Sequence, residues 1–348
     1  MGGAVNIKGM YRDELVKRVE PAYRADQILQ WVYEKQAESF DAMTNLPVTL
    51  RAKLAEQFQL NAVRELRTRR ATDTTEKFLF QLHDGALIET VLIPATPGLT
   101  STDDRQTVCV STQVGCAFGC KFCASGLNGF KRNLTAAEIV DQVCHVQKLT
   151  KQKVNNIVVM GMGEPFANYD NVLRALRILN APWSLGIGAR KMTVSTAGVV
   201  PGIRRLAEEP MQIRLAVSLH GATDEVRGKL MPINRKFPLS ELMAACEYYA
   251  KTKGKMLTFE FILIEGVNDS IEQAHKLAAL ARRAHAKVNL IPYNPVEGLS
   301  WRRPDRDRCK VFQHVLRQAG ISATLRNEKG TDIAAACGQL RLQHEPAT

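Results

Sequence analysis

The sequence has no long hydrophobic run, no internal repeat and no low-complexity segment. No stretch approaches the ~20 consecutive apolar residues that a membrane-spanning helix needs. The residues before Tyr11 also lack the charged-then-apolar pattern of a secretory signal. We therefore expect a cytoplasmic protein that does not contact membranes.

Acidic residues are in the minority. The 348-residue chain has 47 Lys and Arg against 35 Asp and Glu, which gives a formal net charge of +12. A basic excess attracts polyanions and favours a nucleic-acid partner, although basic proteins that bind no nucleic acid are common. Eight cysteines in a chain of this length argue against a disulfide framework, which is typical of short secreted domains. Metal ligation and redox chemistry are the interpretations to test.

Strand-like and helical segments alternate over most of the chain. The first sixty residues have the apolar spacing of helices, and short β-rich segments begin at Lys77. The expected strands are Lys77–Leu82, Leu87–Ile93, Thr107–Thr112, Asn156–Met160, Lys191–Ser195, Gln212–Ser218, Met256–Ile264, Val288–Ile291 and Ser322–Arg326. Repeated βα units build a parallel sheet, whose chemistry gathers at the carboxyl ends of its strands.

Two segments have the spacing of a capping box, in which a short polar side chain precedes a helix and an acidic one follows three residues later. Thr135 and Glu138 form one such pair, and Asp269 and Glu272 form the other. We expect a helix to begin at each of them.

Cys116, Cys120 and Cys123 follow an expected strand with the spacing C-x-x-x-C-x-x-C. Four cysteines saturate a [4Fe–4S] cluster, whereas three leave one iron open. In radical S-adenosylmethionine (SAM) chemistry the open iron binds the amine and carboxylate of SAM, and reductive cleavage then releases a 5′-deoxyadenosyl radical. The spacing predicts one [4Fe–4S] cluster and a radical SAM enzyme. Buried structural cysteines and a zinc knuckle are the alternatives, although a knuckle needs a fourth ligand nearby.

A second motif, Gly161-Met-Gly163-Glu164-Pro, follows the next expected strand. Glycines allow a ligand to approach the backbone, and the Glu164 carboxylate can pair with the ammonium group of SAM. Ser195, Ser218 and Asn294 also follow strands, and they offer hydroxyl and amide groups to the rest of SAM. Ordinary turn residues would have the same appearance at each position.

These motifs resemble the RlmN/Cfr family of RNA adenine methyltransferases from about Tyr23 to Leu340. The matching segments are Cys109–Ala124, Lys131–Thr135, Met160–Pro165, Ser218–His220, Leu230–Asn234, Gly266–Asp269 and Asp332–Leu340. The resemblance implies an α/β fold: a partial (β/α)6 radical SAM barrel over residues 76–348, with an N-terminal β extension and a C-terminal cysteine loop. Residues 1–75 would form a small helical accessory domain that contacts RNA. Gln113–Gly115 and Pro165 favour the RlmN branch.

The RlmN branch methylates C2 of an adenine in 23S rRNA, and some members also modify the adenine 3′ of a tRNA anticodon. The resemblance implies that this chain uses two SAM molecules per turnover. Cys337 would carry the methyl group, Cys109 would release the product by forming a disulfide with Cys337, and Glu89 would act as general base. Leu219 and His220 would join the SAM contacts. The alternative within the family is Cfr-type methylation of C8.

The resemblance further implies a monomer that receives electrons from a donor such as flavodoxin or ferredoxin. Cys144, Cys246 and Cys309 have no motif around them and are interpreted as structural. The basic candidates for RNA contact lie at Arg64, Arg67, Arg69, Arg70, Lys131, Arg132 and Trp301–Arg303. Such groups position RNA rather than select a base, and solvated charged surface is the competing interpretation. A third hypothesis is a non-catalytic Fe–S electron carrier or RNA-binding module, which would have no use for Cys337.

Overall fold

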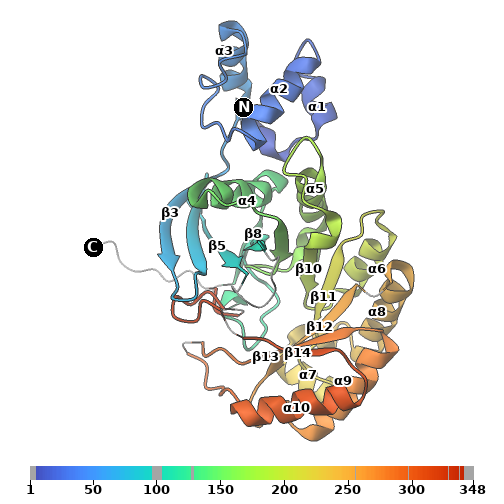
Figure 1. The fold of residues 1–348 in the computed structure, drawn as a ribbon. Helices are drawn as coiled ribbons and strands as arrows, with labels where there is room; N and C mark the ends of the chain where they lie inside the picture. The colour runs from blue at the N-terminus through green and yellow to red at the C-terminus, as the bar shows by residue number, and fades with distance from the viewer. Residues whose placement is uncertain are drawn as a thin grey trace.

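The computed structural model describes residues 5–95, 104–126, 129–254, 256–296, 298–327, 329–336 and 338–340. One mixed sheet forms the centre of the molecule (Figure 1). In spatial order its strands are β14 (Ala323–Leu325), β13 (Lys287–Pro292), β12 (Leu257–Leu263), β11 (Arg214–Ser218), β10 (Met192–Thr196), β9 (Asn156–Val159), β6 (Gln106–Cys109), β5 (Leu87–Pro94), β4 (Glu76–Leu82) and β3 (Val63–Arg70).

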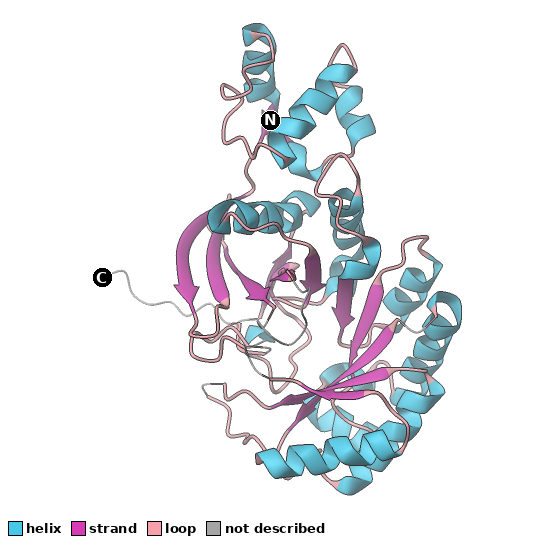
Figure 2. Cartoon of the chain, viewed as in Figure 1, coloured by secondary structure: helices cyan, strands magenta, loops and turns pink. Residues whose placement is uncertain are grey.

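The section from β6 to β14 is parallel throughout, and a helix accompanies each crossover. These helices are α4 (Ala136–Thr150), α5 (Tyr169–Asn180), α6 (Val200–Glu208), α8 (Leu239–Lys253), α9 (Ile271–Arg283) and α10 (Arg306–Gln318). The sheet curves, and α6, α8, α9 and α10 lie along its outer side (Figure 2). Because its two end strands do not pair within the described part of the chain, the barrel is open. The predicted α/β class and partial barrel are confirmed.

The other end of the sheet is antiparallel, since β3, β4, β5 and β6 pair with one another in that sense. The edge strand β3 was not predicted from the sequence. Its residues, Val63–Arg70, read VRELRTRR and lack the alternation of apolar and polar residues that marks a half-buried strand. Its backbone nevertheless pairs with β4, with a bulge between Glu65 and Arg67. Tertiary pairing therefore overrides the local pattern.

Both predicted helices are present, but only one of the two predicted capping residues is correct. Thr135 caps α4 and forms the full capping box with Glu138. Helix α9 is instead capped by Ser270, whose hydroxyl accepts from the Gln273 N–H. Asp269 is engaged elsewhere, because Oδ1 accepts from the Gly266 N–H and Oδ2 pairs with Arg308 at 2.6 Å.

The N-terminal residues form a small unit that sits beside α4 and α5 at one end of the barrel (Figure 1). It contains α1 (Arg12–Val16), α2 (Tyr23–Tyr33) and α3 (Val48–Gln57), and the short strands β1 (Val5–Asn6) and β2 (Phe58–Gln59) pair in parallel. The Lys8 ammonium forms a buried ion pair with Asp141 of α4. Among the described residues, no helix combines the length and apolar character needed to cross a membrane.

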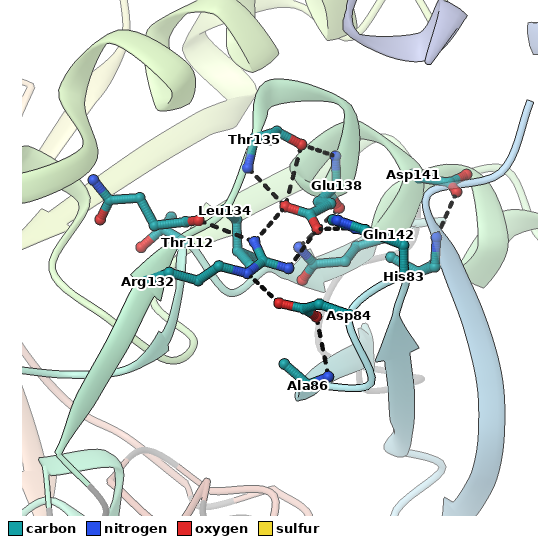
Figure 3. Close-up of polar contacts among 12 residues, drawn as sticks. His83, Asp84, Ala86, Thr112, Arg132, Leu134, Thr135, Glu138, Asp141 and Gln142 are labelled. Carbon is teal, nitrogen blue, oxygen red and sulfur yellow. Dashed lines mark hydrogen bonds and ion pairs between the residues drawn. The ribbon is translucent and has the colours of Figure 1, made fainter. Parts of the chain in front are cut away.

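A separate hairpin brackets the cysteine motif. Strands β7 (Gln113–Gly115) and β8 (Phe130–Asn133) pair antiparallel, and the cysteines lie between them. Arg132 of β8 donates two hydrogen bonds to Glu138, at 2.8 and 3.0 Å, and a third to Asp84 at 2.6 Å. Figure 3 shows this guanidinium between the start of α4 and the turn that joins β4 to β5. The hairpin is thereby held against two other elements.

Candidate active site

The cysteine motif opens into a cavity of about 160 Å³ at the carboxyl ends of the parallel strands. Cys116, Cys120 and Cys123 all line this cavity. The strand-end residues around it include Gly163, Glu164, Ser195, Thr196, Ser218 and His220. Segments that are far apart in the sequence therefore meet at one site, as the βα alternation predicts.

The three cysteines are partly buried where they line the cavity. Burial raises the pKa of Cys116 to about 11, and burial together with the neighbouring Cys123 and Cys116 raises the pKa of Cys120 further. Such thiols stay protonated until a metal displaces the proton. Among the described residues, no three His, Cys, Asp or Glu side chains converge on one ion. The ligands of a cube bind separate irons and need not converge, so this donor set fits a three-cysteine cluster.

Glu164 is buried at the wall of this cavity and is held by donors from two segments. Its Oε1 accepts from the Thr196 hydroxyl at 2.8 Å and the Phe166 N–H at 3.1 Å, while Oε2 accepts from the Ala197 N–H at 2.7 Å. Burial raises the pKa of Glu164 to about 7, and these donors oppose the rise. The carboxylate is thus fixed in place, and a cation bound in the cavity would favour its ionised form.

Gly163 and Gly161 allow the backbone beside Glu164 to pack closely. Gly163 has a φ of +102°, and a Cβ there would lie 2.6 Å from the Gln113 side chain. A Cβ on Gly161 would lie 2.7 Å from the Ser111 hydroxyl oxygen and the Val110 carbonyl oxygen. The two glycines are therefore required for β9 and the segment around β7 to meet.

His220 closes another side of the cavity as a neutral ring. Its Nδ1 accepts from the Ile262 N–H at 3.0 Å, so the neutral imidazole carries its proton on Nε2. Burial, and then the nearby Arg227, lower the pKa of His220 to about 3. The ring packs edge-on against Phe122 in the cysteine loop, with centroids 4.6 Å apart. His220 is a hydrogen-bond donor rather than a charged group at this site.

A second, smaller cavity adjoins the first and shares Cys123, Ser125 and Gly338 with it. Its other lining residues include Cys109, Asn294, Arg326, Lys329 and Ala336. The predicted methyl carrier Cys337 lies outside the described residues. Its described neighbours on both sides line this cavity, and the Gly338 carbonyl accepts from the Ala124 N–H at 2.8 Å. The segment around residue 338 therefore contacts the cysteine motif.

Comparisons with known proteins identify the family. The family model of the Radical SAM superfamily matches residues 110–278. The family model of the ribosomal RNA large subunit methyltransferase N-terminal domain matches residues 5–60. The chain is 56% identical over 342 residues to a probable dual-specificity RNA methyltransferase RlmN 3 of Opitutus terrae, covering 95% of this chain and 91% of that protein. A probable dual-specificity RNA methyltransferase RlmN of Akkermansia muciniphila is 52% identical over 324 residues, covering 93% of this chain and 90% of that protein.

A solved structure agrees with this assignment. The crystal structure of a radical SAM methyltransferase from Sphaerobacter thermophilus superimposes with a TM-score of 0.93 at 47% identity. The match covers 97% of this chain and 100% of that one. The chain belongs to the RlmN family of radical SAM RNA methyltransferases.

Not every predicted SAM contact of this RlmN-family chain lines the first cavity. Leu219 points away from it: its side chain is in the hydrophobic core, because alternate residues at the end of β11 face opposite sides. Asn294 lines the second cavity instead, where its Oδ1 accepts from Arg303 at 2.9 Å.

Glu89 of β5 is buried, and its Oε1 pairs with the Lys77 ammonium at 2.9 Å. Lys77 is also bonded to the Ala334 carbonyl at 3.2 Å, which ties Glu89 to the C-terminal loop of this RlmN-family chain. The same loop is held by the turn before β4, since Asp73 accepts from the Gly330 N–H at 2.8 Å and Asp332 accepts from the Thr72 N–H at 3.0 Å. Sequence reasoning missed Lys77 and Asp73, because nothing local marks a lysine or aspartate as the partner of a loop more than 250 residues away.

The basic residues predicted to contact RNA differ in whether they already pair with other groups of the protein. Arg132 is engaged by Glu138 and Asp84, whereas Lys131 beside it is exposed. Arg64 donates to Gln81 at 2.6 Å and Arg70 pairs with Glu76 at 3.1 Å on the exposed edge of β3.

Proposed function

We propose that this RlmN-family chain methylates C2 of an adenine in 23S rRNA, and the adenine 3′ of a tRNA anticodon, in the cytoplasm. The names of its relatives as dual-specificity RNA methyltransferases support this substrate class. The observation that carries the proposal is the pair of adjoining cavities, one with the three cluster cysteines and Glu164, the other with Cys109 and both described neighbours of residue 337.

In this proposal the first cavity binds SAM. Cys116, Cys120 and Cys123 hold the cluster, Glu164 receives the SAM ammonium group, and Ser195, Ser218 and His220 offer polar groups to the rest of the molecule. When bound, the cluster supplies the electron that cleaves SAM to a 5′-deoxyadenosyl radical. The electron comes from a donor such as reduced flavodoxin or ferredoxin. Phe118 and Phe122, which line the same cavity, shield the cluster from water.

The second cavity is proposed to bring the adenine to Cys337. An aromatic C2–H is not nucleophilic, so ordinary displacement from SAM cannot methylate it. The Cys337 thiolate therefore takes a methyl group from one SAM and leaves S-adenosylhomocysteine. The 5′-deoxyadenosyl radical from a second SAM removes a hydrogen atom from that methyl, and the resulting methylene radical adds to C2. Loss of the C2 proton to a base and return of one electron to the cluster would leave the RNA joined to Cys337. The Cys109 thiolate then attacks the Cys337 sulfur and forms a disulfide with it, the sulfur–carbon bond breaks, and the released carbon takes up a proton to become the methyl group on C2. Glu89, with its pair Lys77, acts as general base near the loop that carries Cys337.

The proposal is tested by reconstituting the enzyme anaerobically with iron, sulfide, reductant and SAM, and then analysing treated 23S rRNA and tRNA by mass spectrometry. The expected product is C2-methyladenine in both RNAs. C8-methyladenine would instead indicate the Cfr-type reaction, and the absence of any methyladenine would contradict the proposal.

The two cysteine roles are tested by single variants. We expect Cys337→Ala to yield no methylated RNA, because no sulfur remains to carry the methyl group. Cys109→Ala should accumulate a protein–RNA crosslink, which gel shift and mass spectrometry detect. Cys309→Ala is the control, since Cys309 is buried on α10 away from both cavities. Normal turnover in either of the first two variants would remove that cysteine from the mechanism.

A further inference from the structure

Arg227, on the short helix α7 (Asp224–Leu230), is a fully buried guanidinium beneath the strand ends that line the first cavity. Its Nη1 donates to the carbonyls of Ser218 and Leu219, each at 2.7 Å, and its Nη2 donates to the Ala197 carbonyl at 2.6 Å. Nη1 also lies 2.9 Å from the Met231 sulfur. One side chain thus holds the ends of β10 and β11 together.

The charge of Arg227 has no negative partner in the part of the chain that the structure describes. Its acceptors are carbonyl oxygens and a thioether, and no described Asp or Glu lies within ion-pair distance. Its buried Nε has no hydrogen-bond acceptor either. Burying a cation without an anionic partner carries a large desolvation penalty even after the protein relaxes around it. Asp224 acts on this cation only at longer range, so the described residues provide no ion-pair partner for it.

The cysteine motif packs against the end of the helix that carries this cation. The Leu230 carbonyl, at the end of the same helix, accepts from the N–H of Lys121 at 2.9 Å. Met231, which contacts the guanidinium, packs in one cluster with Cys120, Cys123 and Phe122. Burial lowers the pKa of Arg227 to about 10, and the proximity of Cys120 is foremost among the effects that oppose the decrease. Arg227 remains charged at neutral pH and is close to the cluster ligands without bonding to them.

We propose that Arg227 is the counter-cation of the cluster and that its charge raises the cluster's reduction potential. Three thiolate ligands bring negative charge into a buried site. One-electron reduction of the cluster adds one more negative charge. A fixed cation in a medium of low dielectric stabilises the reduced state more than the oxidised one. Arg227 is thus a positioning and tuning residue rather than a catalytic one. The inference rests on the cluster of the proposed function but not on which adenine carbon is methylated.

The first test compares Arg227→Gln with Arg227→Lys, because both variants lose hydrogen bonds while only lysine keeps the charge. Each protein is reconstituted without RNA, and the midpoint potential of the cluster is measured by titration with dithionite followed by electron paramagnetic resonance. We expect Arg227→Gln to shift to a more negative potential and Arg227→Lys to stay near the wild-type value. A purely structural role would shift both variants alike, and that result, or no shift in either, would overturn the proposal.

A second pair of variants leaves Arg227 in place. It tests the role of the Arg227 charge even if the Arg227 variants cannot bind a cluster. Met231→Glu would neutralise the guanidinium, whereas Met231→Gln has the same shape without charge. The expected result is a more negative potential, or loss of the cluster, for Met231→Glu alone. Equal potentials in the two variants would overturn the proposal. Failure of the wild-type protein to bind any cluster would instead contradict the proposed function.

Discussion

At the scale of single residues, Glu164 is the side chain that the fold positions for the proposed ligand. Its two oxygens accept three hydrogen bonds from Phe166, Thr196 and Ala197, so its position is fixed before any ligand binds. Burial raises its pKa to about 7, which means that the empty site does not strongly favour the anion. A bound ammonium group would provide the missing positive charge. The residue is therefore positioned for a cationic ligand, and no cation of the described residues forms an ion pair with it.

We expect Glu164→Gln to weaken SAM binding by roughly 10- to 100-fold, the equivalent of about 1.5–3 kcal/mol for a lost charge-assisted hydrogen bond. Isothermal titration of SAM into reconstituted enzyme measures the change. Iron content and melting temperature show whether the site itself is intact. As a control, Glu209→Gln removes a carboxylate that pairs with Arg177 outside both cavities, and it should leave SAM affinity unchanged. Equal affinities for Glu164→Gln and the wild type would show that Glu164 is not the ammonium partner.

At the scale of elements, the β7–β8 hairpin positions the cysteine motif. In the sequence, the cysteines lie between its two strands. Arg132 of β8 pairs with Glu138 at the start of α4 and with Asp84 in the turn between β4 and β5 (Figure 3). Glu138 is almost fully buried and also caps α4. The hairpin, the helix start and the turn are therefore connected through Arg132, which restrains the ends of the cysteine loop.

Replacing Arg132 with methionine should loosen this unit. The buried Glu138 carboxylate would lose its partner, at a cost of about 1–3 kcal/mol in the free energy of unfolding. We also expect iron to be lost faster to a chelator, because the loop ends are no longer fixed. Thermal denaturation and the rate of iron release measure the two effects. Arg205→Met provides a matched comparison, since its ion pair with Asp170 is exposed and should contribute little. Wild-type iron retention in Arg132→Met would contradict the positioning role.

At the scale of the whole molecule, Asp141 connects the N-terminal unit to the barrel. Its carboxylate pairs with Lys8 and His145 and accepts from the N–H groups of Ala62 and Val63, at 2.5 and 3.1 Å. The N-terminal unit, the segment leading into β3 and helix α4 thus meet at one buried carboxylate. Burial opposes ionisation there, but Lys8 and His145 outweigh it and lower the pKa of Asp141 to about 2.

This depressed pKa predicts a specific response to acid. Because the pKa of Asp141 is about 2 in the folded protein against an ordinary value of 3.8, its contribution is complete above pH ~4 and is lost as the pH falls towards 2. We expect Asp141→Asn to reduce the free energy of unfolding by about 3–5 kcal/mol at neutral pH, because the buried Lys8 charge loses its partner. Denaturant unfolding of wild type and variant at several pH values measures both effects. A constant difference between the two proteins from pH 5 to pH 2 would contradict this assignment.

The sequence by itself determined the parts of the protein that short spacing encodes. The cysteine motif, the Gly163-Glu164 turn and the Thr135 cap each depend on neighbours within a few residues, so their local geometry could be predicted. The alternation of strands and helices also placed these motifs at one edge of the sheet. The charged strand β3 escaped prediction, because its stability comes from pairing with β4 rather than from its own residues.

Only the tertiary structure decided which distant residues act together. It brings Cys109 and the neighbours of residue 337 to one cavity, links Lys77 to the C-terminal loop, and buries Arg227 beside the cysteine motif. No local pattern distinguishes Arg227 from a solvated arginine on a short helix. Its burial becomes visible only when the ends of β10 and β11 close over it, because burial and the absence of an ion-pair partner among the described residues are properties of the assembled chain. For the same physical reason the sequence could predict the cluster, while the fold was needed to find the charge that we propose balances it.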